Sequence, residues 1–237
     1  MTARHRIGLL GGTLDPIHNG HLEAAEAARR SLTLDVVWIL PSRTPPHRLP
    51  DPHASGFHRF AMAALAVADR QGMLTSDREL LREGPSYTSH TLEHLTREGF
   101  EPSQLFFILG SDAFADISTW YDYPRLLDMS HFVVISRPGM PPPTPDPRLP
   151  TPEVKGRVRE PHDSGRSSLM GSSSTGIFFI DAQTPQVSSS EIRERVSTGR
   201  PIDGLVPKAV AAHIHRHGLY KATDVGPTLN KIPRAIE

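Results

Sequence analysis

Short apolar runs alternate with helical patterns along most of this chain, and this alternation limits the folds that it can adopt. The runs have the length of strands: RIGLL (6–10), DVVWIL (35–40), QLFFILG (104–110), HFVVIS (131–136) and IFFIDA (177–182). Helical patterns occupy residues 21–32, 57–71, 87–99, 188–199 and 206–218. Continuous apolar strands are typical of a parallel sheet covered on both faces. The sequence therefore predicts an α/β fold, a Rossmann-like doubly wound parallel sheet with helices on both faces and closing C-terminal helices.

The segment 57–71, FHRFAMAALAVADRQ, has a strong helical pattern. Its apolar positions at helical spacing are Phe57, Phe60, Ala61, Ala64, Leu65 and Ala68. The pattern predicts a helix between the second strand and the middle of the chain.

The stretch from 138 to 176 breaks the alternation. It contains PGMPPPTPDPRLPTP and then SGRSSLMGSSSTG. Proline favours extended chain, and Gly/Ser-rich chain cannot pack a core. We therefore expect one domain over residues 1–221, with a long mobile insertion at about 138–176 and a flexible tail over 222–237. Removing residues 141–174 is accordingly expected to preserve folding.

Composition excludes several functional classes. Lysine plus arginine and aspartate plus glutamate are equal at 26 each, so net charge favours neither nucleic acid nor an acidic membrane surface as a partner. The chain has no cysteine, which excludes disulfides, thiolate catalysis and cysteine-ligated zinc. The apolar stretch near the N-terminus is too short for a signal peptide, and no run has the length of a membrane span. We expect a soluble cytoplasmic protein, with a homo-oligomer left open.

The stretch GGTLDPIHNGHL at 11–22 joins the first apolar run to the first helical segment. Its glycine pair at 11–12 lets backbone N–H groups approach an anion, and the helix beginning near 19–20 points its positive end at the same place. His18 and His21 are three residues apart, so both imidazoles lie on one side of the first turn. They can donate hydrogen bonds to phosphate oxygens and stabilise charge in a transition state. The stretch predicts a phosphate site; a strand-to-helix turn with incidental histidines is the alternative.

Two other phosphate-binding patterns do not fit this stretch. The P-loop pattern G-x-x-x-x-G-K-[ST] is absent, with no lysine near Gly20, and the dinucleotide pattern G-x-G-x-x-G also fails. The pattern T-x-D-P-x-H-x-G-H, beginning at Thr13, is far more specific and resembles the HxGH signature of the nucleotidylyltransferase superfamily. That resemblance implies transfer of a nucleotidyl group from ATP or CTP.

A second helix start, late in the chain, offers a second anion site. Residues 187–193, VSSSEIR, combine the N–H groups of a helix N-terminus, serine hydroxyls and Arg193 one turn in. They resemble the superfamily motif ISSTxIR, with valine and serine in place of isoleucine and threonine. The resemblance implies a role in holding the β- and γ-phosphates, which leave as pyrophosphate. Ser188-x-x-Glu191 is also a capping-box pattern that any helix can use, and both interpretations can hold together.

Further segments in the middle of the chain resemble one family. PPHR (45–48) is similar to the family's PPHK/R segment, and GPSYT (84–88) with TL (91–92) is similar to its SYTxxTL segment. LGSD (109–112) is similar to the family's G-x-D after a strand. WY (120–121), LL (126–127) and VVISRPG (133–139) are similar to its W-Y…LL…RPG run. These motifs occur in order. Together they resemble the bacterial nicotinate-nucleotide adenylyltransferases from about residue 6 to 220, apart from the insertion.

The resemblance implies adenylyl transfer from ATP to nicotinate mononucleotide, which gives nicotinate adenine dinucleotide and pyrophosphate in NAD biosynthesis. The acceptor phosphate would attack the α-phosphorus in line, so positioning and charge stabilisation would supply the catalysis. Mg²⁺ would bridge phosphate oxygens with few direct protein ligands, and no dedicated protein metal site is expected. His18, His21 and Arg193 are the expected catalytic residues, with His21 as the main transition-state stabiliser.

The resemblance also assigns binding residues. Those expected for ATP are Gly11, Gly12, Thr13, His18, His21, Arg48, Ser189, Ser190 and Arg193. Those expected for nicotinate mononucleotide are Ser42, Thr88, Asp112, Trp120, Tyr121 and Arg137. Arg48 would reach the triphosphate, and Asp112 would bond a ribose hydroxyl or order the site.

Within the acceptor site, Trp120 would stack on the pyridine ring with Tyr121 beside it. Thr88 and the Tyr121 backbone would meet the nicotinate carboxylate. Arg137 and Ser42 would help to hold the phosphate of the mononucleotide.

Other functions stay open at this point. The acceptor could be nicotinamide mononucleotide or pantetheine phosphate, and an inactive nucleotide-binding regulator is a third alternative. The run HTLEH (90–94) matches the H-x-x-E-H pattern of a zinc protease, but such a match arises easily among 13 histidines, and no third ligand is evident. His213, His215 and His217 form a histidine-rich helix end, which suits the helix dipole and could bind metal adventitiously.

Overall fold

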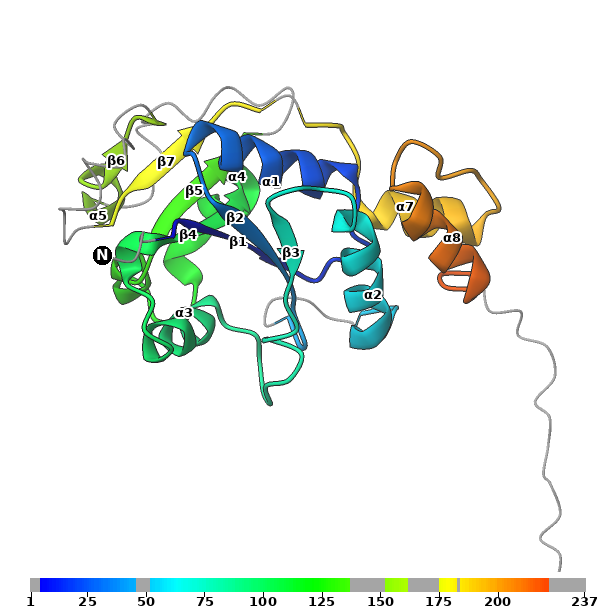
Figure 1. The fold of residues 1–237 in the computed structure, drawn as a ribbon, viewed down its shortest axis with the longest axis horizontal. Coiled ribbons are helices and arrows are strands. Elements are labelled where there is room, and N and C mark those ends of the chain that lie inside the picture. The colour runs from blue at the N-terminus through cyan, green and yellow to red at the C-terminus, as the bar shows by residue number, and fades with distance from the viewer. Residues whose placement is uncertain (1–4, 46–51, 137–151, 162–174, 183, 222–237) are drawn as a thin grey trace, which may run out of the picture.

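The computed structural model describes residues 5–45, 52–136, 152–161, 175–182 and 184–221. Within these ranges a seven-stranded parallel sheet forms the centre of the molecule, in the order β3-β2-β1-β4-β5-β7-β6 (Figure 1). The strands are β1 (Ile7–Gly12), β2 (Val36–Pro41), β3 (Met73–Thr75), β4 (Leu105–Gly110), β5 (His131–Ile135), β6 (Val158–Arg159) and β7 (Ile177–Ile180). The sheet grows outward in both directions from the β1–β4 pair. The predicted doubly wound parallel sheet is confirmed.

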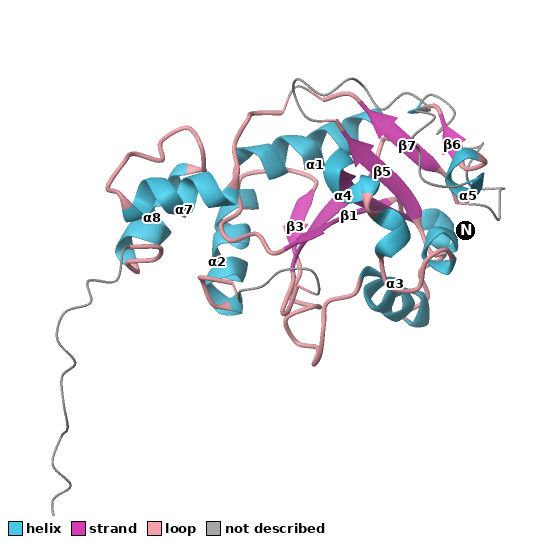
Figure 2. Ribbon diagram, turned by 180° about the vertical axis from the view of Figure 1, so that it is seen from behind, coloured by secondary structure: helices cyan, strands magenta, loops and turns pink. Residues whose placement is uncertain are grey.

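Helices cover both faces of the sheet (Figures 1 and 2). They are α1 (Asn19–Ser31), α2 (Gly56–Val67), α3 (Thr88–Arg97), α4 (Ser111–Ala115), α5 (Pro152–Lys155), α7 (Ser189–Ser197) and α8 (Lys208–Arg216), with short 3₁₀ helices at Pro102–Gln104, Ile117–Thr119 and Arg125–Asp128. Buried residues of α1, α2, α7 and α8 share one core with the sheet, and those of α3 and α4 share the other. None of the helices in the described ranges is both long and apolar enough to cross a membrane.

Alternate residues of each central strand divide between these two cores. On β4, Phe106 and Ile108 join the core under α1, whereas Phe107 and Leu109 join the core under α3. This division follows from the two-residue repeat of a strand. Because both faces are buried, the strands have no polar face, and they therefore form continuous apolar runs in the sequence.

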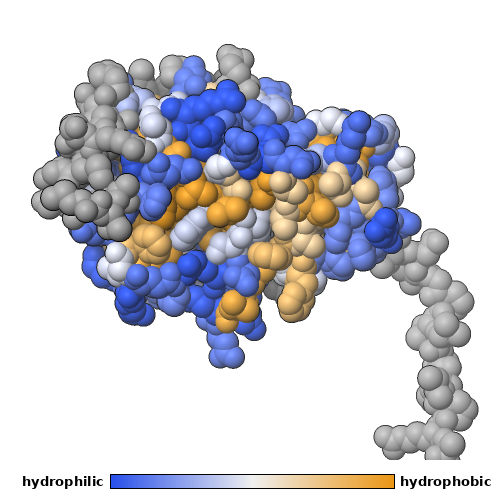
Figure 3. All heavy atoms as spheres, viewed as in Figure 1, coloured by the Kyte–Doolittle hydropathy of each residue, from blue (hydrophilic) through white to orange (hydrophobic). Residues whose placement is uncertain are grey.

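Helix α2 buries a different set of residues from the apolar positions of its helical pattern. Its buried residues are Arg59, Met62, Ala63, Ala66 and Val67. By contrast, Phe57 is 89% exposed and Leu65 is 39% exposed. Figure 3 shows apolar side chains along the outer side of this helix. The helix is apolar on most sides, so the pattern alone cannot decide which side faces the sheet.

Part of the segment expected to be a mobile insertion belongs to the fold. Helix α5 and strand β6 lie within it, and β6 pairs with β7. Val154 is fully buried in the core under α3. The Arg157 guanidinium donates to the Leu127 carbonyl at 3.1 Å and to the Thr175 hydroxyl at 2.9 Å. The remainder of the expected insertion and the tail over 222–237 lie outside the described residues.

This packing predicts a cost for truncating Val154. We expect Val154→Ala to lower the free energy of unfolding by about 2 kcal/mol, because it leaves a cavity at a fully buried position. Lys155→Ala, at the exposed next residue, is the control and should change it by less than about 0.5 kcal/mol. Urea unfolding followed by circular dichroism measures both. Unchanged stability of Val154→Ala would show that this segment is not part of the folded unit. Deleting residues 141–174 would remove β6 and Val154, so that deletion is now expected to destabilise the fold.

Candidate active site

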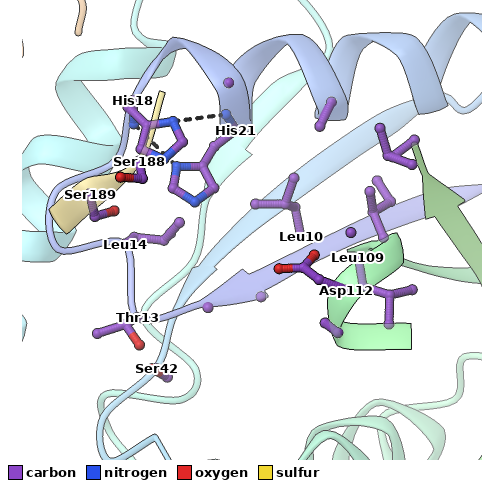
Figure 4. A pocket seen from close by; sticks show the side chains of 18 of the residues that line it. Leu10, Thr13, Leu14, His18, His21, Ser42, Leu109, Asp112, Ser188 and Ser189 are labelled. Atoms are coloured by element: carbon purple, nitrogen blue, oxygen red, sulfur yellow. Dashed lines mark hydrogen bonds between the residues drawn. The ribbon is translucent and has the colours of Figure 1, made fainter. Parts of the chain in front are cut away.

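A cavity of about 750 Å³ opens at the carboxyl ends of β1 and β4. The strand order reverses at this pair, and helices leave its two strands toward opposite faces, which is where open α/β sheets bind ligands. Residues predicted for the site that line it are Gly11, Gly12, Thr13, His18, His21, Ser42, Thr88, Asp112, Trp120, Tyr121, Ser189 and Ser190. Figure 4 shows His18 and His21 at one end of this cavity and the Asp112 side chain entering it from α4.

His18 and His21 form a reciprocal cap at the start of α1. The ring Nδ1 of His18 accepts the His21 N–H at 3.3 Å, and the ring Nδ1 of His21 accepts the His18 N–H at 3.2 Å (Figure 4). The rings stack with centroids 3.6 Å apart. Since each Nδ1 accepts a backbone hydrogen bond, each neutral ring carries its proton on Nε2. Both imidazoles can therefore donate a hydrogen bond from Nε2, and the stacking fixes the position of the two rings relative to each other.

Gly20 makes room for this stacked pair. A Cβ atom built at Gly20 would lie 3.1 Å from the His18 ring and 3.3 Å from the Val187 side chain. Both distances are shorter than ordinary van der Waals contact, so a larger residue would need the His18 ring or the Val187 side chain to move by a few tenths of an ångström. The glycine between the histidines therefore favours the stacked arrangement.

The N-terminus of α7 faces the same cavity from the other side. The Ser188 hydroxyl accepts the Glu191 N–H at 3.1 Å, which is one half of the capping box. The Glu191 carboxylate pairs with Arg195 instead. The Ser189 hydroxyl donates to the Pro16 carbonyl at 2.9 Å, across 173 residues of sequence. The two predicted phosphate elements are therefore directly bonded to each other.

Arg193 lies near the cavity but is not one of the described residues that line it. Its guanidinium donates to the Asp15 carbonyl at 2.7 Å and to the Ser190 hydroxyl at 3.2 Å. In this arrangement Arg193 holds the loop that follows β1. Direct contact with phosphate stays a prediction for this residue.

Aromatic residues also line the cavity, and one of them, Trp120, packs against the core under α3. The Trp120 ring meets Phe107 edge to face, with centroids 6.1 Å apart. Tyr121 is 53% exposed and stacks on Tyr87 at 4.6 Å. Tyr87 also lines the cavity and was not predicted as a site residue. Arg48 and Arg137, both predicted to bind phosphate, lie outside the described residues.

Glu79 is a buried acid in the cavity wall that the sequence did not single out. It is 6% exposed, accepts the Thr91 hydroxyl at 2.8 Å and hydrogen-bonds the Ser86 side chain. Burial raises its pKa to about 7. It lies in an irregular segment between β3 and α3, where no periodic pattern could have indicated its burial.

Asp15 is a second buried acid that sequence patterns left without a role. Its carboxylate is 3% exposed and accepts the His53 and Ala54 N–H groups at 2.7 and 3.1 Å. The Tyr220 hydroxyl donates to the same carboxylate at 2.7 Å. Tyr220 lies 205 residues from Asp15 in the sequence, so only the tertiary structure brings these two side chains together.

The side chains of the H-x-x-E-H run at 90–94 contact different partners. Glu93 pairs with Arg125, His94 pairs with Glu98, and His90 meets the Tyr87 ring edge to face. Across the parts of the chain that the structure describes, no group of three or more histidine, aspartate or glutamate residues could hold a metal ion.

The histidine-rich end of α8 lies against α2. His213 Nε2 is 3.1 Å from His58 Nδ1, and the His217 ring packs on both. Desolvation, and then the neighbouring histidines, lower the pKa of His213. These rings join two helices away from the cavity.

Comparisons with known proteins show the family to which this chain belongs. A cytidylyltransferase-like family model matches residues 9–195. A probable nicotinate-nucleotide adenylyltransferase of Syntrophotalea carbinolica is 36% identical over 221 residues, covering 92% of this chain and 99% of the relative. One from Pseudomonas fluorescens is 40% identical over 218 residues, covering 92% and 98%.

Solved structures share the fold. The Plasmodium falciparum nicotinic acid mononucleotide adenylyltransferase complexed with NaAD has a TM-score of 0.64 at 17% identity, covering 91% of this chain and 97% of that chain. The same protein complexed with APC has a TM-score of 0.60. With the family model and the curated relatives, the matched length and identity show that this chain belongs to the nicotinate-nucleotide adenylyltransferase family of nucleotidyltransferases.

Proposed function

We propose that this protein transfers the adenylyl group of ATP to nicotinate mononucleotide, releasing pyrophosphate and forming nicotinate adenine dinucleotide. The observation that carries the proposal is the convergence of two helix N-termini on one cavity. The stacked His18–His21 pair begins α1, and Ser189 and Ser190 begin α7. Helix N-termini and polar hydrogen donors together favour an extended anion such as a triphosphate.

The triphosphate would lie between these two helix starts. His21 and His18 would donate to oxygens of the α-phosphate, where negative charge grows during transfer. The hydroxyls of Ser189 and Ser190 would hold the outgoing β- and γ-phosphates. The acceptor phosphate would attack the α-phosphorus in line, and the reaction needs only orientation and charge stabilisation from the protein.

The acceptor would occupy the part of the cavity that aromatic residues line. Trp120 and Tyr121 offer the pyridine ring a stacking surface, and Thr88 lies on the same wall for the nicotinate carboxylate. Ser42 is suited to the mononucleotide phosphate and Asp112 to a ribose hydroxyl. Arg48 and Arg137 remain predicted phosphate ligands on the strength of their motifs.

The residues present fit a metal ion that enters with ATP. Asp112 and Glu191 line the cavity and offer carboxylate oxygens, which are ligands that Mg²⁺ prefers. Mg²⁺ that entered with ATP would neutralise triphosphate charge there. The cytoplasm, which supplies ATP, is the compartment that we propose for the reaction.

The acceptor can be tested directly. We expect pyrophosphate release with ATP and Mg²⁺ to be strongly selective for nicotinate mononucleotide over nicotinamide mononucleotide and pantetheine phosphate. Coupled-assay kcat/KM values for the three acceptors measure this selectivity. A preference for either other acceptor would keep the adenylyl transfer and refute the acceptor assignment. An absence of release with all three would favour a nucleotide-binding regulator.

The role of His21 is tested by removing its ring. His21→Ala should lower kcat roughly a hundredfold to a thousandfold, because it deletes a donor to the reacting phosphate. His94→Ala changes a half-exposed histidine that pairs with Glu98 on α3, and it should leave kcat unchanged. Circular dichroism confirms that both variants fold. Near-normal turnover of His21→Ala would refute the catalytic role.

Glu79 makes stability depend on pH. Its pKa is about 7 in the folded protein, against an ordinary value of 4.5, so the folded state binds more protons between these values. The contribution of Glu79 to stability must therefore fall as the pH rises from 4.5 to 7, by about 3 kcal/mol in total, whereas the contribution of buried His131, whose pKa is lowered to about 4, rises over much of the same range. Glu79→Gln mimics the neutral acid and should remove this fall, whereas the exposed Glu83→Gln should keep it. Urea unfolding at several pH values measures it, and identical slopes for the two variants would contradict the assignment.

A further inference from the structure

The loop between β1 and α1, residues 13–18, has a conformation that its own sequence does not favour. Leu14 has a φ of 51°, in the left-handed region that non-glycine residues rarely adopt. Its side chain is 2% exposed, so the backbone cannot relax without exposing an apolar group. Such a residue persists only where surrounding contacts determine its conformation. The loop also ends at His18, the first of the two stacked imidazoles.

A buried arginine from α2 supplies one set of these contacts. Arg59 is 1% exposed, and its guanidinium donates to the carbonyls of Thr13 at 2.7 Å, Ala54 at 3.2 Å and Arg43 at 3.4 Å. These acceptors belong to the loop after β1 and to the chain between β2 and α2. Burial lowers the pKa of Arg59, yet a guanidinium stays protonated. Its rigid fork fixes the two loops relative to each other.

Asp15 provides the opposite charge and extends the network to the end of the described chain. Its carboxylate accepts from the backbone of His53 and Ala54 and from the Tyr220 hydroxyl. Burial raises the pKa of Tyr220, so the phenol stays protonated and donates. Hydrogen bonds therefore connect the loop to α2, to the segment after α8 and, through Arg193 and Ser189, to α7.

We propose that Arg59, acting with Asp15 and Tyr220, is the positioning residue that sets the catalytic geometry of the 13–18 loop and of His18 and His21. Arg59 is not among the described residues that line the cavity, so it acts through the loop and touches no substrate. This inference rests on the proposed adenylyl transfer. A displacement of the imidazoles by a fraction of an ångström would slow the chemical step. Thr88, Trp120 and Tyr121, assigned to the nicotinate ring and carboxylate, belong to other segments, whereas Ser42 adjoins Arg43, whose carbonyl accepts from Arg59. Acceptor affinity should therefore change less than the rate of the chemical step.

Three variants test this proposal in the full-length protein. Arg59→Lys keeps the charge and loses the fork, and Tyr220→Phe removes only the hydroxyl that donates to Asp15. Arg70→Lys changes an arginine just beyond α2 that pairs with Glu23 outside the network, and it serves as the control. For each variant, kcat, the KM for ATP, the KM for the acceptor and the thermal midpoint are measured.

We expect kcat to fall roughly tenfold to a hundredfold in Arg59→Lys and about tenfold in Tyr220→Phe. The KM for nicotinate mononucleotide should stay within about twofold of the parent value in Tyr220→Phe and should change less than kcat in Arg59→Lys, since Thr88, Trp120 and Tyr121 lie in other segments. Arg70→Lys should behave as the parent protein. A merely structural role for Arg59 would lower the thermal midpoint and leave kcat per folded molecule unchanged.

A folded Arg59→Lys variant with parental kcat would overturn the inference. If Arg59→Lys does not melt cooperatively, Tyr220→Phe decides, and parental kcat there would overturn it equally. The parent protein is assayed first with all three acceptors. Its failure to release pyrophosphate would refute the proposed function, and this inference with it, whereas an active parent with unaffected variants refutes the inference alone.

Discussion

The reversal of strand order between β1 and β4 is the constraint on which the rest of this structure depends. The helix after β1 packs on one face of the sheet and the helix after β4 on the other, so the chain leaves a crevice between them. Parallel strands bring all of their carboxyl ends to this edge. Loops that are far apart in sequence therefore meet around one cavity, and the functional residues come from these loops.

Within that cavity the two predicted phosphate elements depend on each other. Ser189 and Arg193 of α7 bond the backbone of the same loop that carries the motif of α1. Each helix start would be a weak anion site alone. Together they place two positive helix ends and several donors around one volume, and the bonds between them hold their separation constant. The same bonds hold the left-handed Leu14, so the strain of the loop is balanced by tertiary contacts.

Two groups of residues that line the cavity differ in chemistry. The group near the starts of α1 and α7 presents imidazoles, hydroxyls and helix N-termini, whereas the other presents Trp120, Tyr121 and Tyr87. The first suits a polyanion and the second a flat ring. Glu79 also lines the cavity, where it joins the segment before α3 to that helix through Ser86 and Thr91. A bisubstrate reaction needs such a division, because each substrate must be held independently while their reacting atoms meet.

The sequence by itself determined the parallel sheet, because strands buried on both faces must be apolar throughout. It also determined the histidine motif and the serine-rich helix start, because capping and anion binding depend on residues close together in the sequence. It did not determine which side of α2 is buried or that Val154 packs into the core, since a helix apolar on most sides and a proline-rich segment carry no directional pattern. The sequence also did not predict strand β3, because this strand has only three residues and its Leu74 is exposed. Arg59, Asp15, Tyr220 and Glu79 gained their roles only from the tertiary structure. Each is a charged or polar residue whose partners lie in other loops or further along the chain, and only the folded chain brings those partners within hydrogen-bonding distance.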